Sequence, residues 1–172
     1  MSQTVESTQE ELARRHRAAV RVVSAVFMLT LALVALTLVL VPRLFLDSGP
    51  VVANTLLISI FFLAVGSIVF RRTRFAAMRL QDIAALRGAS GLLETLQWTT
   101  VYVALAGGVI ALLGFLFALM TGERFNVFYP AVIAVAVLAY CYPRRAAWQA
   151  VVGALADTPD EPRQAATKGT IA

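Results

Sequence analysis

The sequence predicts an all-α membrane protein, a four-transmembrane-helix bundle built of two consecutive hairpins with both termini in the cytoplasm. Hydrophobic residues make up 59% of the chain and charged residues 15%, against roughly 45–50% and 25% in an ordinary soluble domain. The apolar residues also fall in a few long runs, whereas soluble helices and strands interleave apolar and polar positions. Both observations indicate that a lipid bilayer is the main solvent of this chain.

The first two apolar runs are at residues 22–41 and 51–70. Each supplies the roughly 20 apolar residues that a helix needs to cross the hydrocarbon core of a bilayer. The first run stops at Pro42, and the second follows Pro50, a residue suited to the first turn of a helix. Because only a short connection separates these two spans, we expect them to form a hairpin.

The third and fourth runs are at residues 96–120 and 127–142. A third helix that begins near Leu92 would be longer than a bilayer core of about 30 Å, so we expect a tilt or a cytoplasmic extension. Pro130 and Pro143 mark the limits of the shorter fourth helix. The resulting division is a polar N-terminal segment at residues 1–17, a transmembrane domain at 18–156 with a cytoplasmic loop at 71–91, and a disordered tail at 157–172.

Arginine sets the predicted orientation, because Lys and Arg close to the ends of spans stay on the cytoplasmic side. Most basic residues precede the first run, lie between the second and third, or follow the fourth, and only Arg43 and Arg124 fall on the other side. This split places both termini in the cytoplasm and favours a multi-pass protein of a bacterial inner membrane. The arginines expected to fix the topology and to meet lipid headgroups are Arg14, Arg15, Arg17, Arg21, Arg71, Arg72, Arg74, Arg144 and Arg145.

The net charge of +5 does not require a nucleic acid partner. The arginines stand at the ends of predicted helices, where anionic lipid headgroups and topology account for them. The expected partners are therefore the lipid bilayer and either other membrane subunits or further copies of this chain, with no nucleic acid.

Small residues recur along one face of the third predicted helix at spacings of three and four. In lipid, a row of small residues lets a second helix approach closely, so we interpret this row as a helix-packing seam. Ala25, Ala32 and Ala35 give the first helix a shorter stripe of the same kind. The seam does not tell whether its partner is a helix of this chain or of another subunit. Its members are Thr100, Ala104, Gly107, Ala111, Gly114 and Ala118.

The sequence predicts no catalytic residue, no cofactor and no metal site. It has one histidine, His16, before the first span, and one cysteine, Cys141, so one chain cannot supply a haem held by two histidines or a dithiol pair. The polar residues Glu94, Gln97 and Tyr102 near the start of the third span could line a shallow site. We favour a structural role for them, with Glu94 capping a helix that starts after a break at residues 88–91.

Three classes of function remain open. The favoured class is a non-catalytic packing or accessory subunit of a membrane complex. The second is a small oligomeric channel or transporter for a small solute or ion, which would use the neutral polar residues of the second and third spans. The third is an interfacial enzyme that acts on lipid headgroups through Glu94, Asp82 and the arginines. The balance is against an enzyme.

Overall fold

The computed structural model describes residues 2–44, 49–74 and 77–156, and every regular element in these ranges is a helix. Four stretches are long and apolar enough to cross a membrane: Gln9–Leu40, Gly49–Arg74, Gly91–Thr121 and Arg124–Ala150. The predicted all-α class with four candidate spans is therefore confirmed. The elements in chain order are α1 (Ser2–Leu40), α2 (Gly49–Arg74), α3 (Ala77–Thr121), the 3-10 helix η1 (Arg124–Val127), α4 (Phe128–Cys141) and α5 (Arg145–Ala156).

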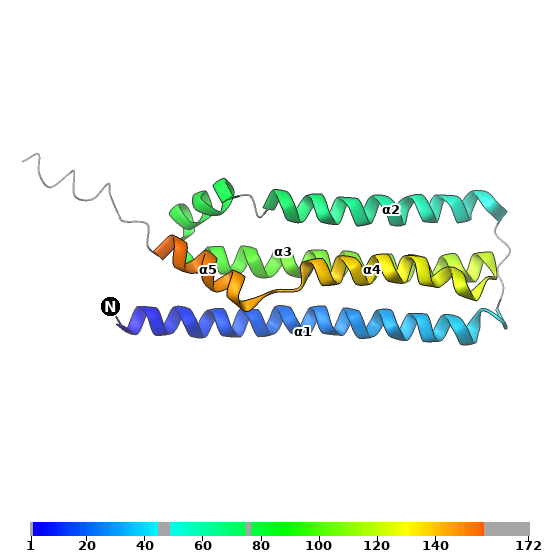
Figure 1. The fold of residues 1–172 in the computed structure, drawn as a ribbon, viewed down its shortest axis with the longest axis horizontal. Coiled ribbons are helices and arrows are strands. Elements are labelled where there is room, and N and C mark those ends of the chain that lie inside the picture. Colours follow the sequence, from blue (N-terminus) through cyan, green and yellow to red (C-terminus); the bar gives the residue numbers. More distant parts are fainter. Residues whose placement is uncertain (1, 45–48, 75–76, 157–172) are drawn as a thin grey trace, which may run out of the picture.

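The third helix, α3, is the centre of the bundle. It packs against α1, α2 and α4, and it also contacts η1 and α5. Figure 1 shows α1 and α2 on opposite sides of the pair formed by α3 and α4. Although α1 and α2 follow one another in the sequence, α1 packs mainly on α3 and makes few contacts with α2. Gly122, with a φ of +69°, ends α3 and lets the chain turn back, so that α4 can pack beside α3.

Buried hydroxyl groups in the bundle are satisfied by their own helices. Thr30, Thr37 and Ser67 are buried, and each hydroxyl donates to the backbone carbonyl four residues earlier over 2.6 to 2.9 Å. Thr99 and Thr100 do the same at 2.8 Å. Such bonds hide a polar group in an apolar environment without a partner from another helix.

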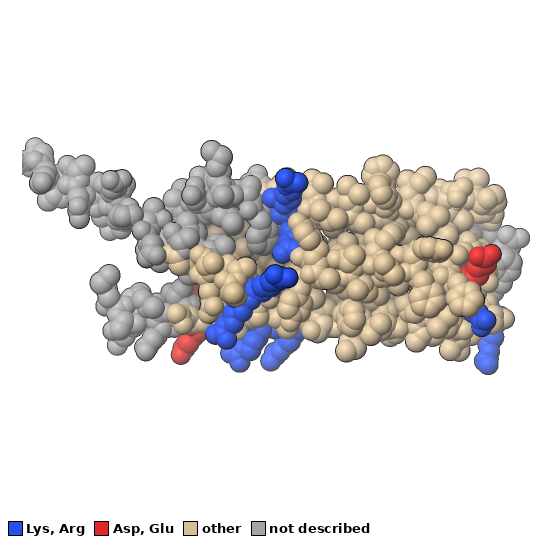
Figure 2. Space-filling model, in the orientation of Figure 1, with Lys and Arg blue, Asp and Glu red and all other residues tan. Residues whose placement is uncertain are grey.

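Basic side chains gather in two bands (Figure 2). The larger band lies toward the end of the bundle that carries α5, and the smaller one lies at the opposite end. Arg21 belongs to the larger band by its position on α1, and the helical residues from there to Leu40 rise about 28 Å at 1.5 Å per residue. That length matches a hydrocarbon core of about 30 Å, so the two bands stand where lipid headgroups would lie.

One expectation about a helix end is wrong. The structure has one helix from Ala77 to Thr121, so residues 88–91 do not end a helix, and Figure 1 shows the first turns of α3 set at an angle to the remainder. Each glycine in a helix costs about 1 kcal/mol, a penalty that burial of a neighbouring stretch can offset. The polar N-terminal segment forms the start of α1 from Ser2 onward. The predicted tail at residues 157–172 lies outside the described residues.

A small apolar cluster holds the helices together at the level of the larger basic band. It joins Leu12 and Ala19 of α1 with α3 and with Trp148 of α5, each almost fully buried. The His16 ring meets the Trp148 ring edge to face with centroids 5.6 Å apart, and its Nε2 lies 2.9 Å from the Pro143 carbonyl oxygen. This cluster fixes α5 across the end of the bundle. The α3 members are Leu92, Leu93 and Leu96.

Candidate functional site

A pocket of about 550 Å³ opens at the end of the bundle that carries α5. Its walls come from the end of α2, the middle of α3, the end of α4 and the start of α5. We call it the basic pocket, because three arginines line it. Its volume lies within the range of about 300 to 1,000 Å³ that is usual for small-molecule sites. The lining residues are Arg71, Arg72, Leu96, Thr100, Ala139, Tyr140, Cys141, Tyr142, Pro143, Arg144, Ala147 and Trp148.

The local sequence explains why α4 opens into this pocket. Pro143 cannot continue a helix, and the residue before a proline is driven to an extended conformation. Tyr142 accordingly has φ −55° and ψ 123°, so α4 ends at Cys141 and the chain turns outward. A new helix, α5, then starts at Arg145, and the buried Trp148 holds it in place. The turn between α4 and α5 leaves room beside the end of α2.

The arginines of the basic pocket combine positive charge with aromatic surfaces. Arg72 and Arg144 are exposed, and Arg71 is partly buried. The guanidinium carbon of Arg71 lies 4.5 Å from the centroid of the Tyr140 ring, a cation–π arrangement that fixes the position of its side chain. A planar guanidinium offers paired N–H donors that match the oxygens of phosphate and carboxylate groups. The chemistry available here is therefore anion binding next to aromatic rings.

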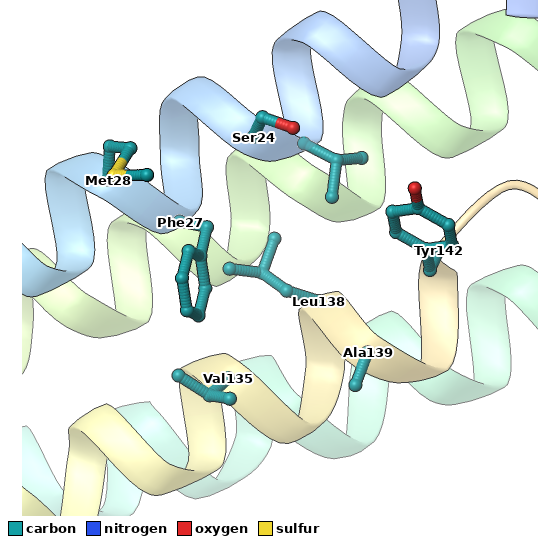
Figure 3. A pocket seen from close by; sticks show the side chains of 8 residues that line it. Ser24, Phe27, Met28, Val135, Leu138, Ala139 and Tyr142 are labelled. Atoms are coloured by element: carbon teal, nitrogen blue, oxygen red, sulfur yellow. The ribbon is translucent and has the colours of Figure 1, made fainter.

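An apolar groove between α1 and α4 adjoins the basic pocket. It encloses about 290 Å³, and Figure 3 shows Phe27 of α1 and Leu138 of α4 pointing into the space between the two helices. Ala139 and Tyr142 line both this groove and the basic pocket. This apolar groove and the basic pocket thus meet at the end of α4. We call the groove the α1–α4 groove.

All six residues of the predicted packing seam are buried within the single chain. A Cβ atom on Gly107 would lie 3.3 Å from the Leu138 side chain, and one on Gly114 would lie 2.4 Å from Cβ of Pro130. The two glycines of the seam therefore face α4 and permit the close approach of the two helices. In contrast, Ala25, Ala32 and Ala35 are exposed. The buried side of α1 is instead its Val23, Val26, Thr30 and Thr37 face.

The predicted polar residues of α3 are only partly brought together. Glu94 and Tyr102 line a groove of about 170 Å³ between α2 and α3 with Arg74, whereas Gln97 does not line it. Residues 94, 98 and 102 follow a spacing of four and share a helix face. Glu94 lies well inside α3, so its predicted role as a cap is wrong. Trp98 and Tyr102 are exposed, with ring centroids 5.6 Å apart. The side chain of Asp82 lies outside the described residues.

The other predicted arginines do not converge on one site. Arg14, Arg17 and Arg21 are exposed on α1. Arg15 pairs with Glu11 one turn earlier, at 2.8 Å, and both side chains are partly buried. Ion pairs of this kind near the surface contribute little to stability. Arg145 is exposed on the first turn of α5 and does not line the basic pocket. Arg71, Arg72 and Arg144 are thus the part of the predicted set that surrounds a cavity.

The part of the chain that the structure describes contains no group of three or more His, Cys, Asp or Glu residues that could hold a metal ion. No protein family model matches the sequence, and no curated protein or solved structure shows significant similarity to it. The functional argument consequently depends on the geometry of this chain alone.

The sequence did not reveal the basic pocket as a unit. The sequence predicts for each of its arginines a role in membrane topology, and nothing in their spacing shows that residues 71–72 and 144 share a cavity. One signal was present: alternating crossings bring the end of the second span and the end of the fourth to the same side of the membrane, and both ends carry arginine pairs. Tyr140 and Tyr142 lie next to the second arginine pair, and tyrosine is common at the membrane–water interface, so they indicate that this pair lies at that interface.

Proposed function

We propose that this chain is a non-catalytic multi-pass protein of a bacterial inner membrane, with both termini in the cytoplasm, that acts as a packing or accessory subunit of a membrane complex. The observation that carries the proposal is a row of small residues on the outward face of α2. Thr55, Ser59 and Gly66 lie on one helix face and are exposed, and the 69% exposed Phe62 lies between Ser59 and Gly66 on the same face. A Cβ atom placed on Gly66 would meet nothing within 4 Å. We call this row the α2 face.

The α2 face has the features of a helix-docking surface. The hydroxyls of Thr55 and Ser59 donate to carbonyls of α2 itself at 2.9 and 2.8 Å, so their polar groups are satisfied in lipid. Small residues allow a second backbone to approach closely, which is the main source of helix association where lipid and side chains are equally apolar. Within the chain, small residues of α3 allow α4 to pack closely against it. On α2 the small residues Thr55, Ser59 and Gly66 point outward, which favours a partner helix from another subunit.

Photo-crosslinking in intact membranes tests this proposal. A photoreactive amino acid at Ser59 should produce a discrete crosslink to another protein, because that position lies within the α2 face. The matched control is the same amino acid at Leu112, which is 48% exposed on the central helix α3, with the exposed side chains of Val109 and Leu116 one turn away on either side. Crosslinks to lipid alone at both positions would overturn the proposal.

The orientation is tested separately with single cysteines in a Cys141→Ser background. Arg17→Cys should be protected from a membrane-impermeant maleimide added outside spheroplasts, and Leu44→Cys should react. Both positions are exposed in the bundle, so protection would result from the membrane and not from burial in the protein. The reverse pattern would place the termini outside.

The alternative of an oligomeric channel or transporter has less support from the geometry. Its candidate residues are Asn54, Ser59, Ser67, Thr99, Thr100 and Tyr102. Ser67, Thr99 and Thr100 are buried and donate their hydroxyl hydrogens to their own helices, as the exposed Ser59 does. Asn54 and Tyr102 are exposed. These residues do not line one path through the described chain. Solute flux into vesicles that contain only this protein would reverse this preference.

A further inference from the structure

The basic pocket and the α1–α4 groove together match the two parts of a phospholipid. The pocket lies in the larger basic band, at the level expected for headgroups, and the groove extends from it between residues 23–28 of α1 and 135–142 at the end of α4. Ala139 and Tyr142 belong to both. A ligand that carries an anionic group on an apolar chain can occupy both spaces without a break.

Charge decides which lipid class fits. Arg72 and Arg144 reach the basic pocket from α2 and from the start of the α5 region, so two cations from distant parts of the sequence face one cavity. Arg71 adds a third, positioned over the Tyr140 ring. A phosphate group between guanidinium groups gains charge-assisted hydrogen bonds, and the neighbouring low-dielectric region strengthens them. A zwitterionic headgroup would bring its own cation into the same cavity.

We propose that the basic pocket binds the phosphate headgroup of one anionic phospholipid while an acyl chain of that lipid lies in the α1–α4 groove. Arg72 and Arg144 hold the phosphate, and Ala139 and Tyr142, which line both spaces, lie at the level where headgroup and acyl chain join. Val135 and Leu138 line the groove around the chain. Because α2, α4 and α5 all contribute to the pocket, the bound lipid links the peripheral helix α2 to the rest of the bundle.

Native mass spectrometry of the full chain, released from nanodiscs of equal parts phosphatidylglycerol and phosphatidylcholine, tests the proposal. The wild type should retain one phosphatidylglycerol at least about ten times more often than one phosphatidylcholine. The Arg72→Gln/Arg144→Gln variant should lose this preference, and Arg72→Lys/Arg144→Lys should recover part of it through charge alone. Both arginines are exposed, so their replacement leaves the helix packing intact.

The matched control is Arg17→Gln/Arg21→Gln, which removes two exposed arginines of the same basic band outside the pocket. It should keep the wild-type preference. An equal loss in this control would overturn the proposal in favour of diffuse attraction between the basic band and anionic lipid. Equal retention of both lipids by the wild type would overturn it as well.

Two further arms distinguish a lipid from free phosphate. Val135→Trp fills the α1–α4 groove and should reduce retention of phosphatidylglycerol several-fold, because its acyl chain loses its place. Inorganic phosphate at millimolar concentration should not displace the lipid from the wild type. Displacement by inorganic phosphate, together with unchanged retention in Val135→Trp, would assign the pocket to a soluble phosphate compound and overturn the lipid proposal.

Discussion

The helices α3 and α2 have nearly the same mean hydropathy, 2.5 and 2.2 over their most apolar stretches, but occupy opposite environments. Half of that stretch is buried in α3 and 17% in α2. Hydropathy therefore shows that a helix enters the membrane and does not show whether it lies at the centre of the bundle. The position of small residues is more informative: on α3 Gly107 and Gly114 are buried against α4, whereas on α2 Ala64 and Ser67 are buried and Thr55, Ser59 and Gly66 face outward.

The largest effect is expected where the two helices differ most, at Gly114. Gly114→Leu would place a side chain on a Cβ position 2.4 Å from Cβ of Pro130, and a proline ring cannot rotate away. Overpacking of this kind costs about 3 kcal/mol or more. We expect a large fall in the free energy of unfolding, measured by titration with dodecyl sulfate in mixed micelles. Gly66→Leu on α2 is the control, and an equal fall there would contradict the difference between the helices.

The second-largest effect on the free energy of unfolding is expected from a cavity in the core. Ile110 of α3 is fully buried, whereas Phe62 of α2 is 69% exposed. Ile110→Ala should lower the free energy of unfolding by about 2 kcal/mol, the lower end of the usual cost, because lipid and protein interior are similarly apolar and mainly packing is lost. Phe62→Ala should change it by less than about 0.5 kcal/mol. The same titration measures both, and a larger loss for Phe62→Ala would place α2 inside the bundle.

A smaller effect is expected at Gly107. A Cβ atom there would lie 3.3 Å from the Leu138 side chain, whose flexible end can shift by a few tenths of an ångström. Alanine also favours the helix by about 1 kcal/mol over glycine. The two terms nearly cancel, so Gly107→Ala should change the free energy of unfolding by less than about 1 kcal/mol. A loss as large as that of Gly114→Leu would show that α3 and α4 are equally close at both glycines.

The one stabilising effect is expected at Gly66 itself. With nothing within 4 Å of the added Cβ atom, Gly66→Ala should raise the free energy of unfolding by up to about 1 kcal/mol through helix propensity alone. Thermal aggregation of the purified chain provides a simple measurement. A clear loss of stability in the isolated chain would mean that the α2 face already packs against something within it.

Much of the fold could be predicted because membrane spans depend on local composition. The four apolar runs and the small-residue seam of α3 each lie within one helix, so a periodic pattern reveals them. The stripe Ala25, Ala32 and Ala35 shows the limit of that reasoning. The pattern resembles the seam, but α1 packs through its valine and threonine face, and the alanines face outward. A periodic row marks a possible contact and does not say which row is used.

The basic pocket and the position of Glu94 could not be predicted from the sequence, because both depend on tertiary packing. The pocket depends on how α2, α4 and α5 sit around α3, and neighbours separated by about seventy residues leave no local pattern. Glu94 was placed at a helix start because two glycines precede it. The cluster of Leu92, Leu93 and Leu96 with Trp148 and α1 stabilises the helix through that point. Tertiary packing thus outweighed the local preference of glycine.

The most direct test of the central claim, that α2 presents an outward docking face while α3 is enclosed, is the mass of the complex extracted gently in its native lipids. The wild type should have a mass well above that of a single chain, with at least one partner identified. Gly66→Leu should have the mass of a single chain while its free energy of unfolding stays at or slightly above the wild-type value. A wild type that is already a lone chain would contradict the account.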